Sequence, residues 1–204
     1  MIIKKLKCVD NSHRSIPRGT GPTLNAIDGA QAPAAVGSAG PESSLDLQTS
    51  YPLIYPQGVI FYQTDDPVYE ANYTFAGIFN NPLSALDGSY CQPDPLDLPY
   101  PDPSNKAGAY EGTLQCGIYT PTNVISISYG GSEADLPEAY QTRQCAEFMK
   151  LGMQGVSVVL ASGDNGVAGA AGDQGNSNGC LGKGQIFNPD FPSTCPYIVS
   201  LFLS

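Results

Sequence analysis

The chain has 204 residues, 41% of them apolar, which is enough for one domain with its own hydrophobic core. It carries 19 Asp and Glu against 9 Lys and Arg, for a formal net charge of −10. This balance argues against nucleic acid or anionic lipid as partners, because both repel an acidic surface. No apolar run approaches the roughly 18 residues that a membrane-spanning helix needs.

The first half of the chain predicts a few short elements separated by loops. Residues 1–24 look like an irregular lead-in to a domain over 25–204. A short strand is expected at LNAID (24–28). A helix is expected at PESSLDLQTSYPLI (41–54), with Pro52 ending it.

A strand, a broken helix and a long loop are expected next. GVIFYQT (58–64) is typical of a strand, and TFAGIFNNPLSALDG (74–88) predicts helical pieces broken near Pro82, with Gly88 as a stop. Residues 89–119 are rich in Pro, Asp and Tyr and far exceed the usual length of a connection. Loops of that length are usually functional or tied by disulfides.

The clearest pattern is a strand, a helix and a second strand in succession. NVISISYG (123–130) and VSVVLAS (156–162) predict buried strands, and DLPEAYQTRQCAEFMKLG (135–152) predicts a helix that Gly152 ends, with Asp135 as N-cap. The helix has an apolar stripe of Leu136, Tyr140, Cys145, Phe148 and Met149. Such a unit predicts parallel strands with a right-handed crossover, and catalytic groups gather at the carboxyl ends of such strands.

The cysteines are spaced for disulfides rather than for zinc. No CxxC occurs among the six cysteines. Cys91 and Cys116 flank the long loop, and Cys180 and Cys195 flank a second loop, so both pairs suit local disulfides in an oxidising compartment. Cys145, in the predicted helix, is expected to be free.

Signals for export disagree with one another. The NYT sequon could carry an N-glycan on Asn72, which together with the paired cysteines favours secretion. The N-terminal MIIKKLKCVDNSHRS, however, lacks the apolar segment and cleavage site of a signal peptide. Either export information is missing or the protein is cytosolic.

Carboxylates are the best candidates for chemistry, because the one histidine, His13, lies in the lead-in. Glu42 and Asp46 are four residues apart and share a face of the predicted helix. Held together in a cleft, they would have split pKa values, one acting as base and the other orienting it. The alternative is two solvated acids, with Glu42 favoured by the helix dipole.

Asp164, in SGDNG, stands where the second buried strand ends. Asp before Asn-Gly is common turn chemistry. Alternatively, a protonated Asp164 among glycines such as Gly163, which let a peptide approach, could donate a hydrogen bond to a developing oxyanion. A nucleotide-binding domain is a weaker competitor, because GDNG lacks the GK[ST] continuation and GVAGAAG lacks the GxGxxG spacing.

Three stretches, in this order, resemble motifs of the sedolisin family of serine-carboxyl peptidases, particularly its fungal secreted tripeptidyl-peptidase branch. GPESSLDLQ resembles the Glu-x-x-x-Asp helix motif, VISISYGG the substrate-binding strand, and VVLASGDNGVAG the oxyanion-Asp motif. NPDFPSTCPYIVS resembles the stretch that follows. The resemblance runs from about residue 20 to the end and implies an α/β fold, with a subtilisin-like parallel sheet flanked by helices.

The resemblance assigns roles to the matching residues. Glu42 matches the general base, Asp46 its partner and Asp164 the oxyanion donor. The substrate-binding positions are Ser128, Tyr129, Gly130, Gly131 and Gly163. The family is extracellular and acts at acid pH on peptide or protein substrates, so the resemblance implies a secreted monomer that removes tripeptides from peptide N-termini.

The departures from the family pattern concern what the sequence lacks. The family's serine nucleophile lies in a Gly-Thr-Ser motif that follows the matched stretches, and no GTS occurs here. The expected calcium site, pro-segment and signal peptide are also missing. We therefore expect a C-terminally truncated, inactive part of a catalytic domain, with an unpaired sheet edge. The alternative is a non-enzymatic protein that binds peptides or has no function.

Overall fold

A computed structural model describes residues 16–17, 19–35, 40–64, 66, 68, 77–92, 94–97, 107 and 109–201. The sequon at Asn72 and the histidine at His13 lie outside the described residues. The described elements, in chain order, are β1 (Thr23–Ile27), α1 (Pro41–Ile54), β2 (Ile60–Thr64), α3 (Asn80–Leu86), β3 (Val124–Ile127), β4 (Gly131–Ser132), the 3-10 turn η1 (Glu133–Asp135), α4 (Glu138–Met153), β5 (Ser157–Ala161), the 3-10 turn η2 (Asp173–Gly175), β6 (Asp190–Phe191) and β7 (Val199–Leu201).

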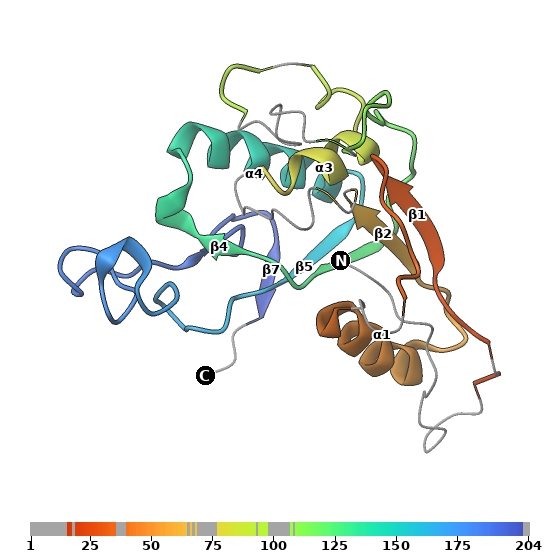
Figure 1. The fold of residues 1–204 in the computed structure, drawn as a ribbon, viewed down its shortest axis with the longest axis horizontal. Helices are drawn as coiled ribbons and strands as arrows, with labels where there is room; N and C mark the ends of the chain where they lie inside the picture. The colour runs from red at the N-terminus through yellow and green to blue at the C-terminus, as the bar shows by residue number, and fades with distance from the viewer. Residues whose placement is uncertain are drawn as a thin grey trace.

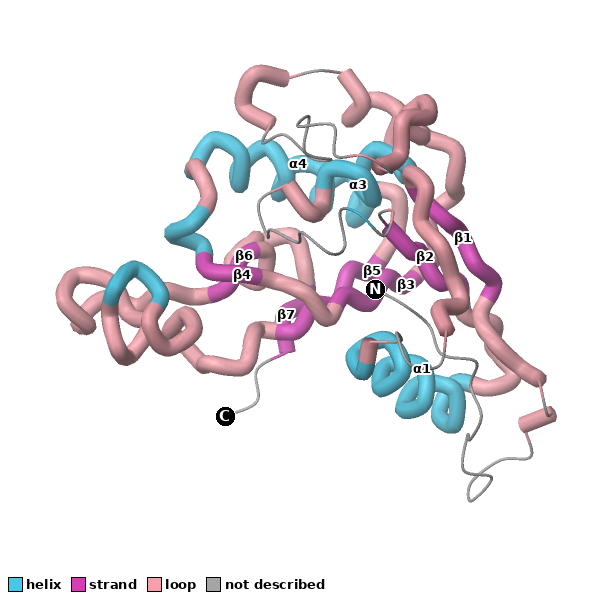
Figure 2. Tube along the Cα trace, in the orientation of Figure 1, coloured by secondary structure: helices cyan, strands magenta, loops and turns pink. Residues whose placement is uncertain are grey.

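The strands form parallel sheets, as the strand–helix–strand pattern predicted. β3, β5 and β7 form one parallel sheet in that order, with α4 connecting β3 and β4 to β5. β1 and β2 form a second parallel pair, and the short β4 and β6 pair antiparallel. In Figure 2, the sheet of β3, β5 and β7 lies at the centre of the molecule, with β1 and β2 to its right and β4 and β6 to its left. The described part of the chain is therefore an α/β structure.

Helices cover the strands from two sides. In Figure 1, α3 and α4 lie above the strands and α1 lies below them. α1 buries Leu47 and Tyr51 against Phe61 of β2. On the other side, α3 and α4 pack on the strands through a larger core that includes Leu83, Phe148, Val158 and Phe191. The smaller core fixes α1 against β2, and the larger core fixes α3 and α4 on the opposite side.

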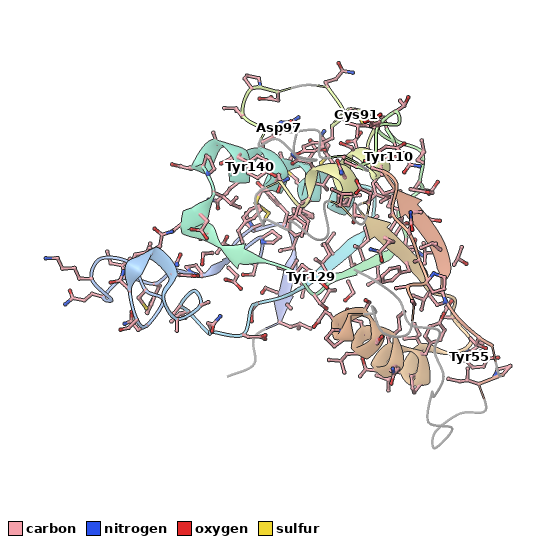
Figure 3. All side chains as sticks on the ribbon, viewed as in Figure 1. Tyr55, Cys91, Asp97, Tyr110, Tyr129 and Tyr140 are labelled. Carbon is pink, nitrogen blue, oxygen red and sulfur yellow. A yellow bond between two sulfur atoms is a disulfide. The ribbon has the colours of Figure 1, made fainter. Side chains whose placement is uncertain are left out.

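A buried hydrogen-bond network joins α3 to α4. The Oδ1 atom of Asn80 accepts hydrogen bonds from the Tyr90 hydroxyl (3.0 Å), the Tyr140 hydroxyl (2.7 Å) and the Gln144 side-chain amide (3.0 Å). Tyr140 lies on the inner side of α4 in Figure 3. Burial raises the pKa of Tyr90 to about 12 despite the hydrogen bond from Gln144. Both tyrosines therefore remain neutral donors within this core.

Both prolines expected to interrupt helices lie inside them instead. α1 continues past Pro52 to Ile54, because the buried Tyr51 anchors its last turn and still accepts the Tyr55 amide at 3.0 Å. Pro82 is the third residue of α3, where an amide has no intrahelical acceptor to lose, so the helix is not broken there.

The helix predicted at 135–152 and the buried strand predicted at 123–130 also differ in detail. α4 begins at Glu138, with Pro137 in the N-cap position, and Asp135 belongs to η1 instead of capping the helix. Leu136 is buried, but it precedes the helix. β3 is not fully buried, and Val124 is 60% exposed, because β3 pairs with β5 along one edge only among the described strands.

The structure confirms one predicted disulfide and corrects the other. Cys91 and Cys116 are bonded across the long loop. Cys195 is bonded to Cys145, not to Cys180, and Cys180 is free. α4 packs against the 191–195 segment, which brings the Cα atoms of Cys145 and Cys195 within 5.6 Å, a normal disulfide separation. In the described part of the chain, no helix is both long and apolar enough to span a bilayer.

Candidate active site

α1 presents two carboxylates on the side that faces the ends of the strands. The helix follows Gly40 in an extended conformation and starts with Pro41, a residue whose fixed φ suits a first helical position. Glu42 lies in the first turn, and Asp46 one turn later on the same face. Both are half-buried, because they border the stripe through which α1 packs on β2.

The carboxyl ends of β3 and β5 supply the opposite side of the site. The parallel register aligns Ile127 of β3 with Leu160 of β5, so Ser128 and Asp164 follow two neighbouring strand ends. Gly163 has a φ of +83°, in the left-handed region that favours glycine. This turn carries Asp164 out of the sheet, where its side chain is exposed.

The structure brings the three predicted carboxylates into one electrostatic neighbourhood. Burial raises the pKa of Glu42, and the negative charges of Asp46 and then Asp164 raise it further. Burial also raises the pKa of Asp46, opposed by a hydrogen bond that the Ser128 hydroxyl donates to Asp46 Oδ1 at 3.2 Å. Like charges placed this close favour keeping a proton within the group.

A fourth carboxylate, Asp190 of β6, also lies beside this group and was not singled out from the sequence. A Cβ atom at Gly163 would overlap the Asp190 carboxylate, so Asp190 lies directly over the turn before Asp164. Burial raises the pKa of Asp190, and so do Asp173 and then Asp164. The signal was present in NPDFPSTCPYIVS, but only the β4–β6 pairing shows that this acid reaches the site.

The expected peptide-binding strand runs past the same group of acids. Tyr129 is half-buried and lies between the strands and α1 in Figure 3. Gly130 approaches the main chain of Phe191 so closely that a Cβ there would lie 2.9 Å from its carbonyl oxygen. Gly131 pairs with Phe191 in the antiparallel contact of β4 with β6, directly after this segment.

The described residues do not offer a metal site. Among them, no three His, Cys, Asp or Glu side chains are grouped so that they could hold a metal ion. The calcium site that the resemblance places elsewhere in the family's catalytic domain stays a prediction, which these residues do not test.

Raised carboxyl pKa values predict that the folded chain is more stable in acid. The acids with raised pKa values are Asp28, Glu42, Asp46, Asp97, Glu147 and Asp190. The folded state then holds more protons than the unfolded state, so the free energy of unfolding should fall as pH rises above about 4. Asp87 acts in the opposite direction, because its pKa is lowered in the folded state. Its contribution to the free energy of unfolding is lost as pH falls.

Urea unfolding at constant ionic strength measures this dependence. We expect a higher midpoint at about pH 4.5 than at about pH 7. The variant Asp190→Asn, which removes one of the raised carboxyls, should flatten the curve. A midpoint that rises with pH would contradict the expectation.

The geometry defines a class of protein: an α/β protein with clustered carboxylates at the carboxyl-terminal edge of a parallel sheet. No protein-family model matches the chain. Tripeptidyl-peptidase sed1 of Aspergillus fumigatus is 61% identical over 190 residues, which cover 92% of this chain and 29% of that protein. Aorsin of Aspergillus oryzae is 52% identical over 197 residues, with the same two coverages.

A third relative, tripeptidyl-peptidase SED1 of Arthroderma otae, is 39% identical over 195 residues, covering 90% of this chain and 28% of that protein. The chain belongs to the family of these proteins, the sedolisins, as its three motifs indicated. It spans about three tenths of the length of these relatives.

Proposed function

We propose that this chain supplies the base, its partner and the oxyanion acid of a serine-carboxyl peptidase that removes tripeptides from peptide N-termini at acid pH. The observation that carries the proposal is the meeting of Glu42 and Asp46, from α1, with Asp164, from the turn after β5. Two of the three relatives described above are named tripeptidyl-peptidases, which supports the proposed reaction.

In the proposed mechanism each carboxyl has a separate task. Glu42 takes the proton from a serine hydroxyl as that hydroxyl attacks the peptide carbonyl. Asp46 holds Glu42 in place and shares its proton, which the mutual repulsion of the pair favours. Asp164, in its protonated form, donates a hydrogen bond to the oxyanion of the tetrahedral intermediate.

Substrate binding is proposed at the strand end beside these acids. An extended peptide would hydrogen-bond with the main chain of Ser128, Tyr129 and Gly130, as an added β-strand does. The turn at Gly163, which has no side chain, would let the backbone of the peptide come close to Asp164. Among the described residues, no cation contributes to the pKa shifts of Glu42, Asp46 and Asp190. Such a cluster of acids suits an enzyme that works in acid.

The nucleophile is proposed to lie outside these 204 residues, because no Gly-Thr-Ser occurs among them. We further propose that the sheet of β3, β5 and β7 is part of a subtilisin-like sheet in an extracellular, monomeric enzyme. Calcium, if used, would bind to another segment of the protein. By this proposal the 204-residue chain alone does not cleave peptides.

The test compares two proteins in one assay. The 204-residue chain and a version extended along its gene to include a Gly-Thr-Ser segment are incubated with a tripeptide–anilide at about pH 4 and about pH 8. We expect cleavage only by the extended version, and only in acid, because Asp164 must be protonated. Equal cleavage at both pH values would refute the role of Asp164. Peptide binding without cleavage by the extended version would favour a non-enzymatic peptide-binding protein.

A further inference from the structure

Ser128 connects the end of β3 to the carboxylates of α1. Its hydroxyl donates a hydrogen bond to Asp46 Oδ1 at 3.2 Å, although the two residues are 82 positions apart. Ser128 directly follows β3, and its main chain continues into Tyr129 and Gly130. One residue therefore belongs both to the proposed peptide-binding strand and, through its side chain, to the carboxylate pair.

We propose that Ser128 is a positioning residue, whose hydroxyl orients the Asp46 carboxylate toward Glu42 and couples it to the peptide-binding strand. The role of Ser128 in catalysis rests on the proposed function, whereas its hydrogen bond to Asp46 does not. It gives the side chain of Ser128 a role separate from main-chain contact with a peptide.

The hydrogen bond distinguishes the two carboxylate oxygens of Asp46. Oδ1 accepts from Ser128, and by this proposal Oδ2 is the oxygen that shares a proton with Glu42. A hydroxyl can donate to Oδ1 whether Asp46 is ionised or carries its proton on Oδ2. The contact can therefore persist through a cycle in which the pair gains and loses a proton.

The surrounding charges make the effect of this hydroxyl measurable. Asp46 shares the helix with Glu42, and Asp164, from the turn after β5, raises the pKa of Glu42. Asp164 also raises the pKa of Asp190 of β6. All of these groups are acidic. Burial favours the neutral form of Asp46 and raises its pKa. The hydrogen bond from Ser128 opposes this effect, because it stabilises the ionised form.

The test titrates the carboxyl groups of the 204-residue chain by 13C NMR with labelled Asp and Glu. In Ser128→Ala we expect the pKa of Asp46 to rise above its value in the parent chain, because a donor to the ionised form is lost. Ser128→Thr, which keeps the hydroxyl, should restore the parent titration. Ser126→Ala removes an exposed hydroxyl from the same strand and should leave Asp46 unchanged.

Ser128→Cys guards against loss of folding in the alanine variant, because a thiol is close in size but a weak donor. Its Asp46 pKa should also rise. If Ser128→Ala and Ser128→Cys both titrate like the parent chain, the positioning role is overturned. A rise that Ser128→Thr fails to reverse would also overturn it, since it would reflect packing rather than the hydroxyl.

Failure of the proposed function would look different. The titration needs no turnover, so its result holds even if the extended version cleaves nothing. In an extended version that does cleave, Ser128→Ala should lower kcat more than it changes KM, and Ser128→Thr should recover kcat. Loss of binding without loss of kcat would contradict a role in orienting Asp46.

Discussion

Replacing Asp164 with alanine is expected to lower kcat of the proposed peptidase by about 10²–10³, the usual cost of losing one oxyanion donor. The protein tested must also carry the serine nucleophile. Asp164 is exposed at the end of β5 and sits in a loop turned by Gly163, so the substitution should not disturb the core. We therefore expect the loss in rate without a matching loss in stability.

Asp164→Asn separates a donor role from a purely electrostatic one. Its side-chain amide donates a hydrogen bond at any pH, so this variant should retain more activity than Asp164→Ala, especially toward neutral pH. Asn165→Ala, at the next exposed position of the loop, should leave kcat within about twofold and serves as the matched control. Equal rates for the parent and Asp164→Ala would exclude the oxyanion role.

Cys145→Ser is expected to reduce the free energy of unfolding by about 2–4 kcal/mol, because the disulfide that it removes closes a long loop. The bond joins α4 to the segment after β6 across a sequence separation of 50. Cys195→Ser should have an effect of similar size. Urea unfolding under non-reducing conditions measures both.

Cys180→Ser is the control, because Cys180 is a free cysteine and only partly buried. Its change should be small. Tryptic mapping of the unreduced chain tests the pairing directly, because the three cysteines fall in separate peptides: 144–150, 151–183 and 184–204. A linked pair of 151–183 with 184–204 would show that the Cys145–Cys195 assignment is wrong.

Local pattern was sufficient for most of the elements. The apolar runs before Ser128 and Ser162 became parallel strands β3 and β5, and the helix expected at 41–54 has those bounds. The predictions were wrong where tertiary packing outweighed a local sequence preference. Pro52 does not end α1 because Tyr51 is anchored in the core.

Pairings between distant residues were the part that local pattern could not predict. Cys180 and Cys195 flank one loop, and nothing in their spacing reveals that α4 places Cys145 nearer to Cys195. Asp190 is likewise an ordinary acid in the sequence. Its proximity to Gly163 follows from the antiparallel contact of β6 with β4.

The sequence by itself determined the family, the parallel strands and the identity of Glu42, Asp46 and Asp164 as candidates, because these depend on residue types at short, fixed spacings. Only the tertiary structure decided that the charges of Asp46 and Asp164 raise the pKa of Glu42, that Ser128 donates to Asp46 and that Asp190 lies beside this group. The physical reason is that burial and charge interactions depend on distances in space, which arise when α1 packs beside the ends of β3 and β5.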